Sequence, residues 1–335
     1  CNSEDDVIAP EPDTPPKTET PKEYIVSLGW KGEILNISDS PLTYSTESTD
    51  LYGVQVYSTP DIDDNSEGYT AYAYGLFDNV GKMKIKLLNG YKYYFVATMV
   101  VNGKNKIASS SSSNSFYSPF SNNTGASTAS TVVANSFKYS NSERFRNLSS
   151  GSTHTEMNGV AERGQVERYY GELADYAPNE NGTANISMKR TSFGVKVIAK
   201  EMTEGKLTVK IDGSEEMYIN HPETEVQEIL SFKDIKQAWI DEVTDWRGNV
   251  LSDEYYEEVP ISFSWTKDDG VDIPLGTETV RFKRNKLTTI EIKVAETSSD
   301  NDIGITYDET GDMEDGETVT VNPDGSSDND VNPEI

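Results

Sequence analysis

The chain reads Lys82-Met83-Lys84-Ile85-Lys86-Leu87, turns at Asn89-Gly90, and continues as a mostly apolar run from Tyr91 to Val101. Strict alternation of lysine with an apolar residue has the period of a β-strand with one buried face. Asn-Gly favours a tight type I′ hairpin turn, and a run that is apolar on both faces is typical of a central strand. A second pair, Asn102-Gly103, precedes Lys106-Ile107-Ala108. The pattern predicts an antiparallel meander of three strands.

Further short strands surround this meander in a first domain that we expect over residues 24–150. Residues 24–30 alternate, with Tyr24, Val26, Leu28 and Trp30 on one face, and strands are also predicted at 53–57 and 69–77. The Ser/Asn-rich stretch 109–130 predicts an exposed, mobile loop. The alternative is a contact loop anchored by its aromatic residues, which are Phe116, Tyr117 and Phe120.

A second domain is expected over residues 151–297, again from alternating segments. They lie at 183–188, 192–199, 206–211 and 261–265, and a last hairpin is predicted at 279–294. Ser231-Phe232-Lys233-Asp234 resembles a capping box, which predicts one short helix with Phe232, Ile235 and Trp239 on its core face. Many short strands with regular turn signals indicate an all-β chain of two tandem β-sandwich domains.

The net charge limits the partners of the chain, and the cysteine content limits its cross-links. Its 335 residues carry a formal net charge of −28, which argues against nucleic acid as a partner and against direct contact with anionic lipid headgroups. The one cysteine excludes an internal disulfide.

That cysteine is Cys1, and the residues after it include the acidic run Ser3-Glu4-Asp5-Asp6. This arrangement resembles mature Bacteroidota lipoproteins, in which an acylated N-terminal cysteine is followed by a short acidic surface-export signal. The resemblance implies a lipid on Cys1, export guided by Ser3, Glu4, Asp5 and Asp6, and a place on the outer face of the outer membrane. Residues 1–23 are rich in proline and acids, which predicts an extended stalk.

The two halves together resemble the fimbrillin-like surface lipoproteins of Bacteroidota. The matching stretches are Cys1 with its acidic run, 72–77, 85–95, 188–196 and 283–286. The resemblance implies two transthyretin-like sandwiches and contacts with pilus components or with an outer-membrane transporter complex. Pilus subunits of that family polymerise after cleavage at an arginine near the N-terminus, whereas the first arginine here is Arg144. We therefore expect a monomeric surface lipoprotein, accessory to a pilus or to an import complex.

The C-terminal segment 298–335 is dense in carboxylates, with possible weak strands at 304–307 and 318–321. Calcium binds six to eight oxygen ligands, which gives the hypothesis that this segment binds calcium weakly. No EF-hand spacing occurs, and a solvated acidic tail is the simpler interpretation. We expect no other cofactor.

No sequence motif of a hydrolase, metalloprotease or nucleotide-binding loop occurs, and the two histidines, His154 and His221, lie far apart. We predict a protein without enzymatic activity. The first functional hypothesis is adhesion or surface assembly through protein contacts; the second is an accessory lipoprotein of a glycan or peptide importer. For the second, exposed Tyr169, Tyr170 or Trp246 are the candidate platforms on which a ligand ring would stack, whereas Trp265 alternates with Phe263 and is expected in the core.

Overall fold

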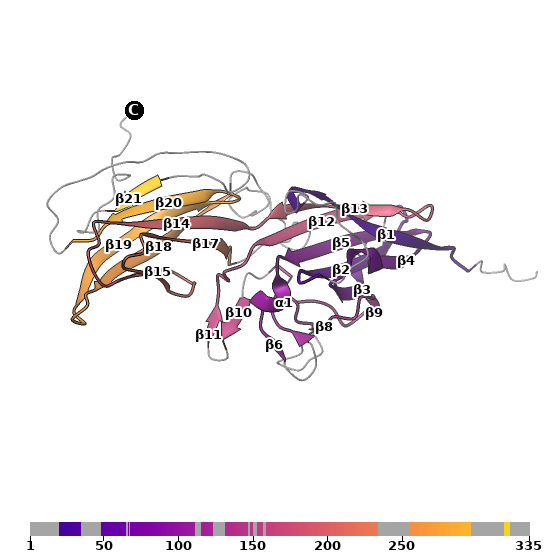
Figure 1. Ribbon diagram of the computed structural model, residues 1–335. Coiled ribbons are helices and arrows are strands. Elements are labelled where there is room, and N and C mark those ends of the chain that lie inside the picture. The colour runs from indigo at the N-terminus through magenta and orange to yellow at the C-terminus, as the bar shows by residue number, and fades with distance from the viewer. Residues whose placement is uncertain are drawn as a thin grey trace, which may run out of the picture.

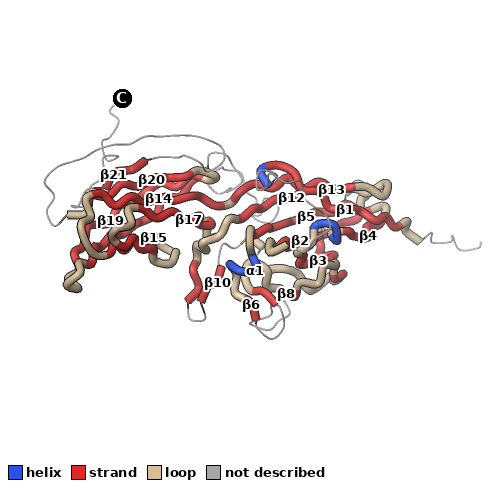
Figure 2. The backbone as a smooth tube through the Cα atoms, in the orientation of Figure 1, coloured by secondary structure: helices blue, strands red, loops and turns tan. Residues whose placement is uncertain are grey.

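The protein is built almost entirely from β-strands. In this computed structural model the described residues are 20–34, 48–64, 66, 68–110, 115–122, 131–146, 148–149, 153–156, 159–233, 255–295 and 318–321. The helical elements named here are one turn each, the 3₁₀ turn η2 (Val80–Lys82) and α1 (Gly103–Lys106), and residues 33–34 are also in a 3₁₀ conformation. Figures 1 and 2 show two strand-built lobes side by side. The predicted all-β class is confirmed. No helix in the described part of the chain is long and apolar enough to cross a membrane.

The first lobe is organised by one eight-stranded sheet. Its order is β4 (Lys84–Leu88), β1 (Glu23–Gly32), β13 (Thr183–Arg190), β12 (Arg168–Tyr176), β5 (Tyr91–Val100), β2 (Leu51–Pro60), β3 (Thr70–Phe77) and β9 (Lys138–Tyr139). Two small sheets accompany it: β6 (Ser109–Ser110), β7 (Ser115–Phe116) and β8 (Thr131–Val132) form one, and β10 (Thr153–Glu156) pairs with β11 (Gly159–Ala161) in the other.

The alternating side chains of β1 and β4 bury the faces that the sequence predicted. Tyr24, Val26, Leu28 and Trp30 point into one apolar cluster, which also holds Ile85 and Leu87 of β4. β5 lies between β12 and β2, as expected for a strand that is apolar on both faces. Hydrophobic side chains line both sides of the central strands. Those on one face belong to the apolar cluster of the first lobe, and those on the other face belong to a second cluster that continues into the second lobe.

The predicted meander is wrong in its pairing. β4 and β5 are connected through Asn89-Gly90, yet β4 pairs with β1 and stands at the opposite end of the sheet order from β2 and β3. Gly90 has a positive φ of 82°, while Asn89 does not, so the turn is not the two-residue type I′ hairpin. Asn102, with φ 54°, precedes the helical turn α1 in place of a second hairpin. At neither Asn89-Gly90 nor Asn102-Gly103 does the chain fold back to pair with the strand that precedes the turn.

The second lobe consists of two four-stranded sheets. One has the order β17 (Glu225–Ser231), β14 (Ser192–Lys200), β20 (Leu287–Lys293), β21 (Thr318–Val321), and the other has β16 (Met217–Asn220), β15 (Lys206–Ile211), β18 (Tyr256–Thr266), β19 (Asp272–Lys283). The expected hairpin over 279–294 does not form, because β19 pairs with β18 and β20 pairs with β14. Phe193 and Phe282 stack between the sheets with ring centroids 4.4 Å apart.

The chain changes sheets at Thr191. Residues 168–190, which we expected in the second domain, form β12 and β13, and these strands pair with β5 and β1 of the first lobe. The domain boundary expected at residue 150 therefore does not coincide with the change of sheet. The physical reason is that β13 supplies a parallel neighbour for β1, which local sequence patterns do not encode.

Three further local predictions can be compared with the structure. Of the three aromatic residues in the Ser-rich stretch, Phe116 and Phe120 are buried and Tyr117 is exposed, so the described part of this stretch is not a wholly exposed loop. Ser231 ends strand β17 and opens no helix there; the remainder of the expected helix, including Ile235 and Trp239, lies outside the described residues. The expected strand at 318–321 is present as β21, parallel to β20, whereas 304–307 lies outside the described residues.

Candidate functional site

The two lobes meet at a network of buried ionic groups. Arg284, in the turn between β19 and β20, binds Glu33 just after β1 through two parallel bonds of 2.7 and 3.0 Å. The backbone N–H of Arg190, at the end of β13, donates to the same carboxylate at 2.7 Å. Two-pronged arginine–carboxylate bonds fix both distance and angle. Glu33 therefore joins the end of the first-lobe sheet to the second lobe.

Arg190 extends this network in the other direction. Its guanidinium binds Glu167 with Nη2–Oε1 at 2.7 Å, and it also donates to Asn285 Oδ1. The Arg190 guanidinium further donates through Nε to the hydroxyl of Tyr169 at 2.9 Å. Sequence patterns missed these residues, because an arginine at a strand end gives no sign of a partner more than ninety positions away.

Tyr169 and Tyr170 are not exposed platforms, contrary to the prediction. Both side chains have 0% relative exposure, so neither ring offers a face to a ligand. The Tyr169 hydroxyl donates to Glu167 at 2.8 Å and that of Tyr170 donates to Glu172 at 2.7 Å. Burial, above all, raises the pKa of both phenols above the ordinary value. The error arose because strand β12 lies in the middle of the eight-stranded sheet with both faces covered.

Arg168 is a fully buried arginine that the sequence analysis did not single out. Its Nη2 donates to Thr98 Oγ1 at 3.2 Å and to the carbonyl oxygen of Leu148. Thr98 Oγ1 in turn donates to Leu148 O at 2.8 Å. These bonds tie β12 and β5 to the segment that covers them. We assign Arg168 a structural role.

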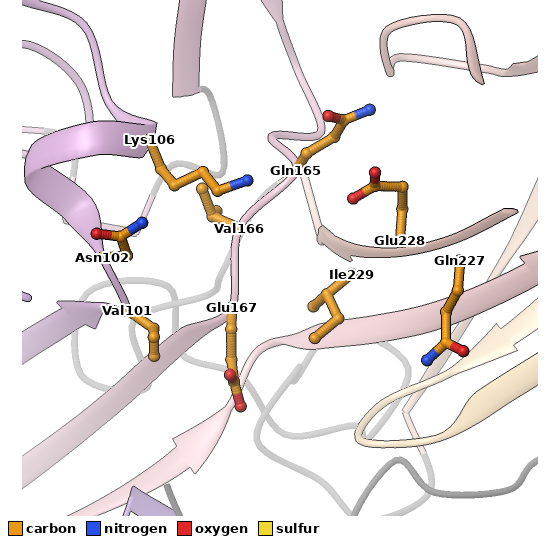
Figure 3. Close-up of a pocket in the computed structure, with 9 residues that line it drawn as sticks. All are labelled: Val101, Asn102, Lys106, Gln165, Val166, Glu167, Gln227, Glu228 and Ile229. Atoms are coloured by element: carbon orange, nitrogen blue, oxygen red, sulfur yellow. The ribbon is translucent and has the colours of Figure 1, made fainter. Parts of the chain in front are cut away.

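The junction also forms a pocket, shown in Figure 3. It has a volume of about 370 Å³, and it is lined from both lobes. The first-lobe side supplies Val101, Asn102 and Lys106, the connecting segment supplies Gln165, Val166 and Glu167, and edge strand β17 supplies Gln227, Glu228 and Ile229. Burial raises the pKa of the Glu228 carboxyl, and nearby Lys106 opposes that shift. The lining of the pocket therefore contains positively and negatively charged side chains, side-chain amides and apolar side chains.

The other predicted site residues divide into two groups. Trp265 is in the core as expected, and its indole N–H donates to Glu204 O at 2.8 Å. Trp246 and the five N-terminal residues, Cys1, Ser3, Glu4, Asp5 and Asp6, lie outside the described residues, as does most of segment 298–335. His221 is exposed. Among the described residues, no three His, Cys, Asp or Glu side chains gather as metal ligands would.

Edge strand β19 is the longest strand of the described chain, with twelve residues. It pairs with β18 along its length and ends the sheet. Pro274 and a bulge opposite Phe263 interrupt the first half, whereas the half from Thr277 onward is regular. Thr277, Thr279 and Arg281 are exposed there. An edge strand presents backbone groups to which another strand can pair.

Comparison with known proteins gives distant likenesses only. No family model and no curated protein matches the sequence. Among solved structures, a candidate adhesin from Bacteroides ovatus has a TM-score of 0.35 at 11% identity, over 78% of this chain and 83% of its own. A candidate cell adhesion protein from Bacteroides eggerthii has 0.35 at 12%, over 82% and 87%. The fimbrial anchor protein Mfa2 from Porphyromonas gingivalis has 0.30 at 10%, over 78% and 82%. At such low scores and identities these likenesses carry no argument about this chain.

Proposed function

We propose that this chain is a non-enzymatic cell-surface protein that acts in adhesion or surface assembly through protein contacts. The observation that carries the proposal is the long edge strand β19, whose regular half ends a sheet and exposes Thr277, Thr279 and Arg281. Partner strands bind such edges through main-chain hydrogen bonds, and exposed side chains select among partners. The Arg284–Glu33 ion pair and the bond from the Arg190 backbone N–H to the same carboxylate link the lobe that carries this edge to the first lobe.

Site-specific photo-crosslinking tests this role. A photoreactive amino acid at Thr279, on the edge, is expected to crosslink a discrete protein on native cells. The matched control is Ser262, which is exposed on the neighbouring interior strand β18. Stronger crosslinking at Thr279 supports edge docking. Equal or absent crosslinking at both positions contradicts it.

A second candidate function is that of an accessory surface lipoprotein in an outer-membrane nutrient importer, and the junction pocket favours it. A transporter accessory needs a site that captures small ligands, and the pocket is of a size that suits one. Purification from native outer membranes separates the candidates. A fixed stoichiometry with a transporter supports the second, whereas filaments or the chain alone support the first.

We further propose that the chain is anchored in the outer membrane by lipid on Cys1 and exported under the direction of Ser3, Glu4, Asp5 and Asp6. The sequence pattern of these residues supports this step. Several buried acyl chains anchor durably, since each buried CH₂ contributes about 0.8 kcal/mol. Mass spectrometry of the native N-terminus is expected to show acylation, and a bare thiol there contradicts it. Replacing Glu4, Asp5 and Asp6 by alanine is expected to lower surface exposure without removing the lipid.

A further inference from the structure

The lining of the junction pocket contains polar groups of two kinds. Glu167 is already bound to Arg190 and Tyr169, and Asn102 Oδ1 accepts from Asn105 at 2.7 Å. By contrast, four further side chains make no hydrogen bond or ion pair within the described part of the chain. They are Lys106, Gln165, Gln227 and Glu228. Groups of the first kind shape the wall. In the second kind, Lys106 and Gln227 are exposed and Gln165 and Glu228 are half-buried, so their hydrogen-bonding capacity is open to a ligand or to water.

Two of the free groups carry opposite charge without pairing to each other. Lys106 comes from α1 and Glu228 from β17, and Figure 3 shows both side chains directed into the space between the lobes. Their charges interact, yet no ion pair within 4.0 Å joins them. Glu228 is partly withdrawn from water, which disfavours its charged form, and the charge of Lys106 offsets only part of that cost. A ligand with an ammonium at one end and a carboxylate at the other compensates both.

The volume of the pocket and the chemistry of its lining restrict the class of ligand further. A volume of about 370 Å³ lies at the low end of the roughly 300–1,000 Å³ of small-molecule sites. Gln165 offers a donor and an acceptor, which matches the N–H and C=O of a peptide bond. Figure 3 shows Gln227 directed to the other side of β17 from Glu228, so we do not assign it to the ligand. Val101, Val166 and Ile229 provide an apolar wall for a small side chain. The lining contains no aromatic ring for a sugar to stack upon.

We propose that the junction pocket binds a short peptide with free termini, its ammonium on Glu228, its carboxylate on Lys106 and a peptide group on Gln165. The site is separate from the edge contact at β19, so it stands or falls independently of the adhesive role. It uses residues of both lobes, and it therefore depends on the junction that Glu33 and Arg284 hold together.

Calorimetric titration of the purified chain tests the proposal with tri-alanine as the probe. Tri-alanine with free termini is expected to bind, and acetylating its amine or amidating its carboxylate is expected to weaken binding about tenfold or more, since each removes a charged hydrogen bond. Glu228→Gln should abolish the preference for a free amine but keep that for a free carboxylate. Lys106→Met should do the reverse.

Matched controls lie outside the pocket. Glu225→Gln is on the same strand β17, and Lys31→Met is exposed at the end of β1; both are expected to leave binding unchanged. Circular dichroism confirms that each variant is folded. The proposal is overturned if tri-alanine gives no binding at millimolar concentration, if blocked and free peptides bind equally, or if the two pocket variants lose affinity without the crossed pattern of preferences.

Discussion

The hydroxyl of Tyr72 on β3 donates a 2.6 Å hydrogen bond to the carbonyl oxygen of Lys86 on β4. In return, the N–H of Lys86 donates to the hydroxyl of Tyr139 on β9 at 2.9 Å, and that of Leu88 donates to Tyr93 at 2.7 Å. β4 pairs with β1 on its other side and ends the sheet. Tyrosine hydroxyls thus bond the outer backbone edge of β4. The two ends of the sheet, β4 and the β3–β9 pair, are joined by these side chains and not by strand pairing.

Removing a hydroxyl from this edge should open it locally. In Tyr139→Phe, the Lys86 N–H loses its acceptor, so we expect its hydrogen exchange to accelerate and the free energy of unfolding to fall by about 0.5–1.5 kcal/mol. Exchange followed by NMR or mass spectrometry measures the first effect. Tyr218→Phe is the control, because that exposed hydroxyl bonds only a side chain, Glu216. Unchanged exchange at Lys86 contradicts the closure.

The junction pair should contribute more to stability than a surface pair of the same chemistry. Glu33→Gln removes the charged carboxylate that binds the guanidinium of Arg284, whose side chain is only 3% exposed. We expect a loss of about 1–3 kcal/mol, less than for a fully buried pair because Glu33 is partly exposed. The control is the exposed pair Arg281–Glu258 on β19 and β18, where Glu258→Gln should cost below about 1 kcal/mol. Denaturant unfolding compares the two variants, and equal losses contradict the assignment.

Buried tyrosines predict a loss of stability at high pH. Burial is the main cause of the raised pKa values of Tyr52, Tyr72, Tyr169 and Tyr170. Their folded-state pKa values lie above that of the unfolded chain, which is about 10. Up to about pH 9 these tyrosines are neutral in both the folded and the unfolded chain, so they should not change the free energy of unfolding. Above about pH 10 they should lower it, because the tyrosines of the unfolded chain ionise while those of the folded chain stay neutral.

Unfolding in denaturant across this pH range, with tyrosinate absorbance as a second signal, measures that loss. Tyr52→Phe removes one titrating group and should make the fall above pH 10 shallower. Gradual ionisation of these tyrosines in a chain that stays folded is the contrary outcome.

The Ser-rich stretch should prove energetically uneven. Phe120 is fully buried, and a Cβ at Gly53 of β2 would lie 2.6 Å from its ring, so the two are closely packed. Phe120→Ala should cost about 3–5 kcal/mol, whereas Tyr117→Ala, three residues away and exposed, should cost below about 1 kcal/mol. Thermal unfolding of both variants measures this contrast. Similar small losses would mean that the stretch is not anchored.

Weak calcium binding by the acidic segment 298–335 remains a proposal from its carboxylate content. Calorimetry of the full chain with millimolar calcium should give heat that disappears when the aspartates at 300, 302, 308 and 312 are replaced by asparagine. No heat in the unsubstituted chain contradicts it.

Local sequence patterns predicted strands and buried faces well, since alternation depends only on neighbouring residues. Tyr24 to Trp30, Phe193 to Ala199 and Phe263 with Trp265 bury the side chains that their period-two spacing indicated. The same patterns failed at Asn89-Gly90 and at the turn around Asn285. At both places the two strands joined by a short turn pair with other strands, because a turn signal marks a chain reversal but does not specify which strands pair.

The amino-acid sequence by itself determined the all-β class, the position of most strands and which side of each strand is buried, because these follow from the two-residue repeat of an extended chain. Only the tertiary structure decided that β1 lies beside β13, that Tyr169 and Tyr170 are enclosed, and that Lys106 and Glu228 face one pocket. Strand pairing joins residues 156 positions apart in the chain, as between Ser27 and Thr183, and no local pattern records such a partner.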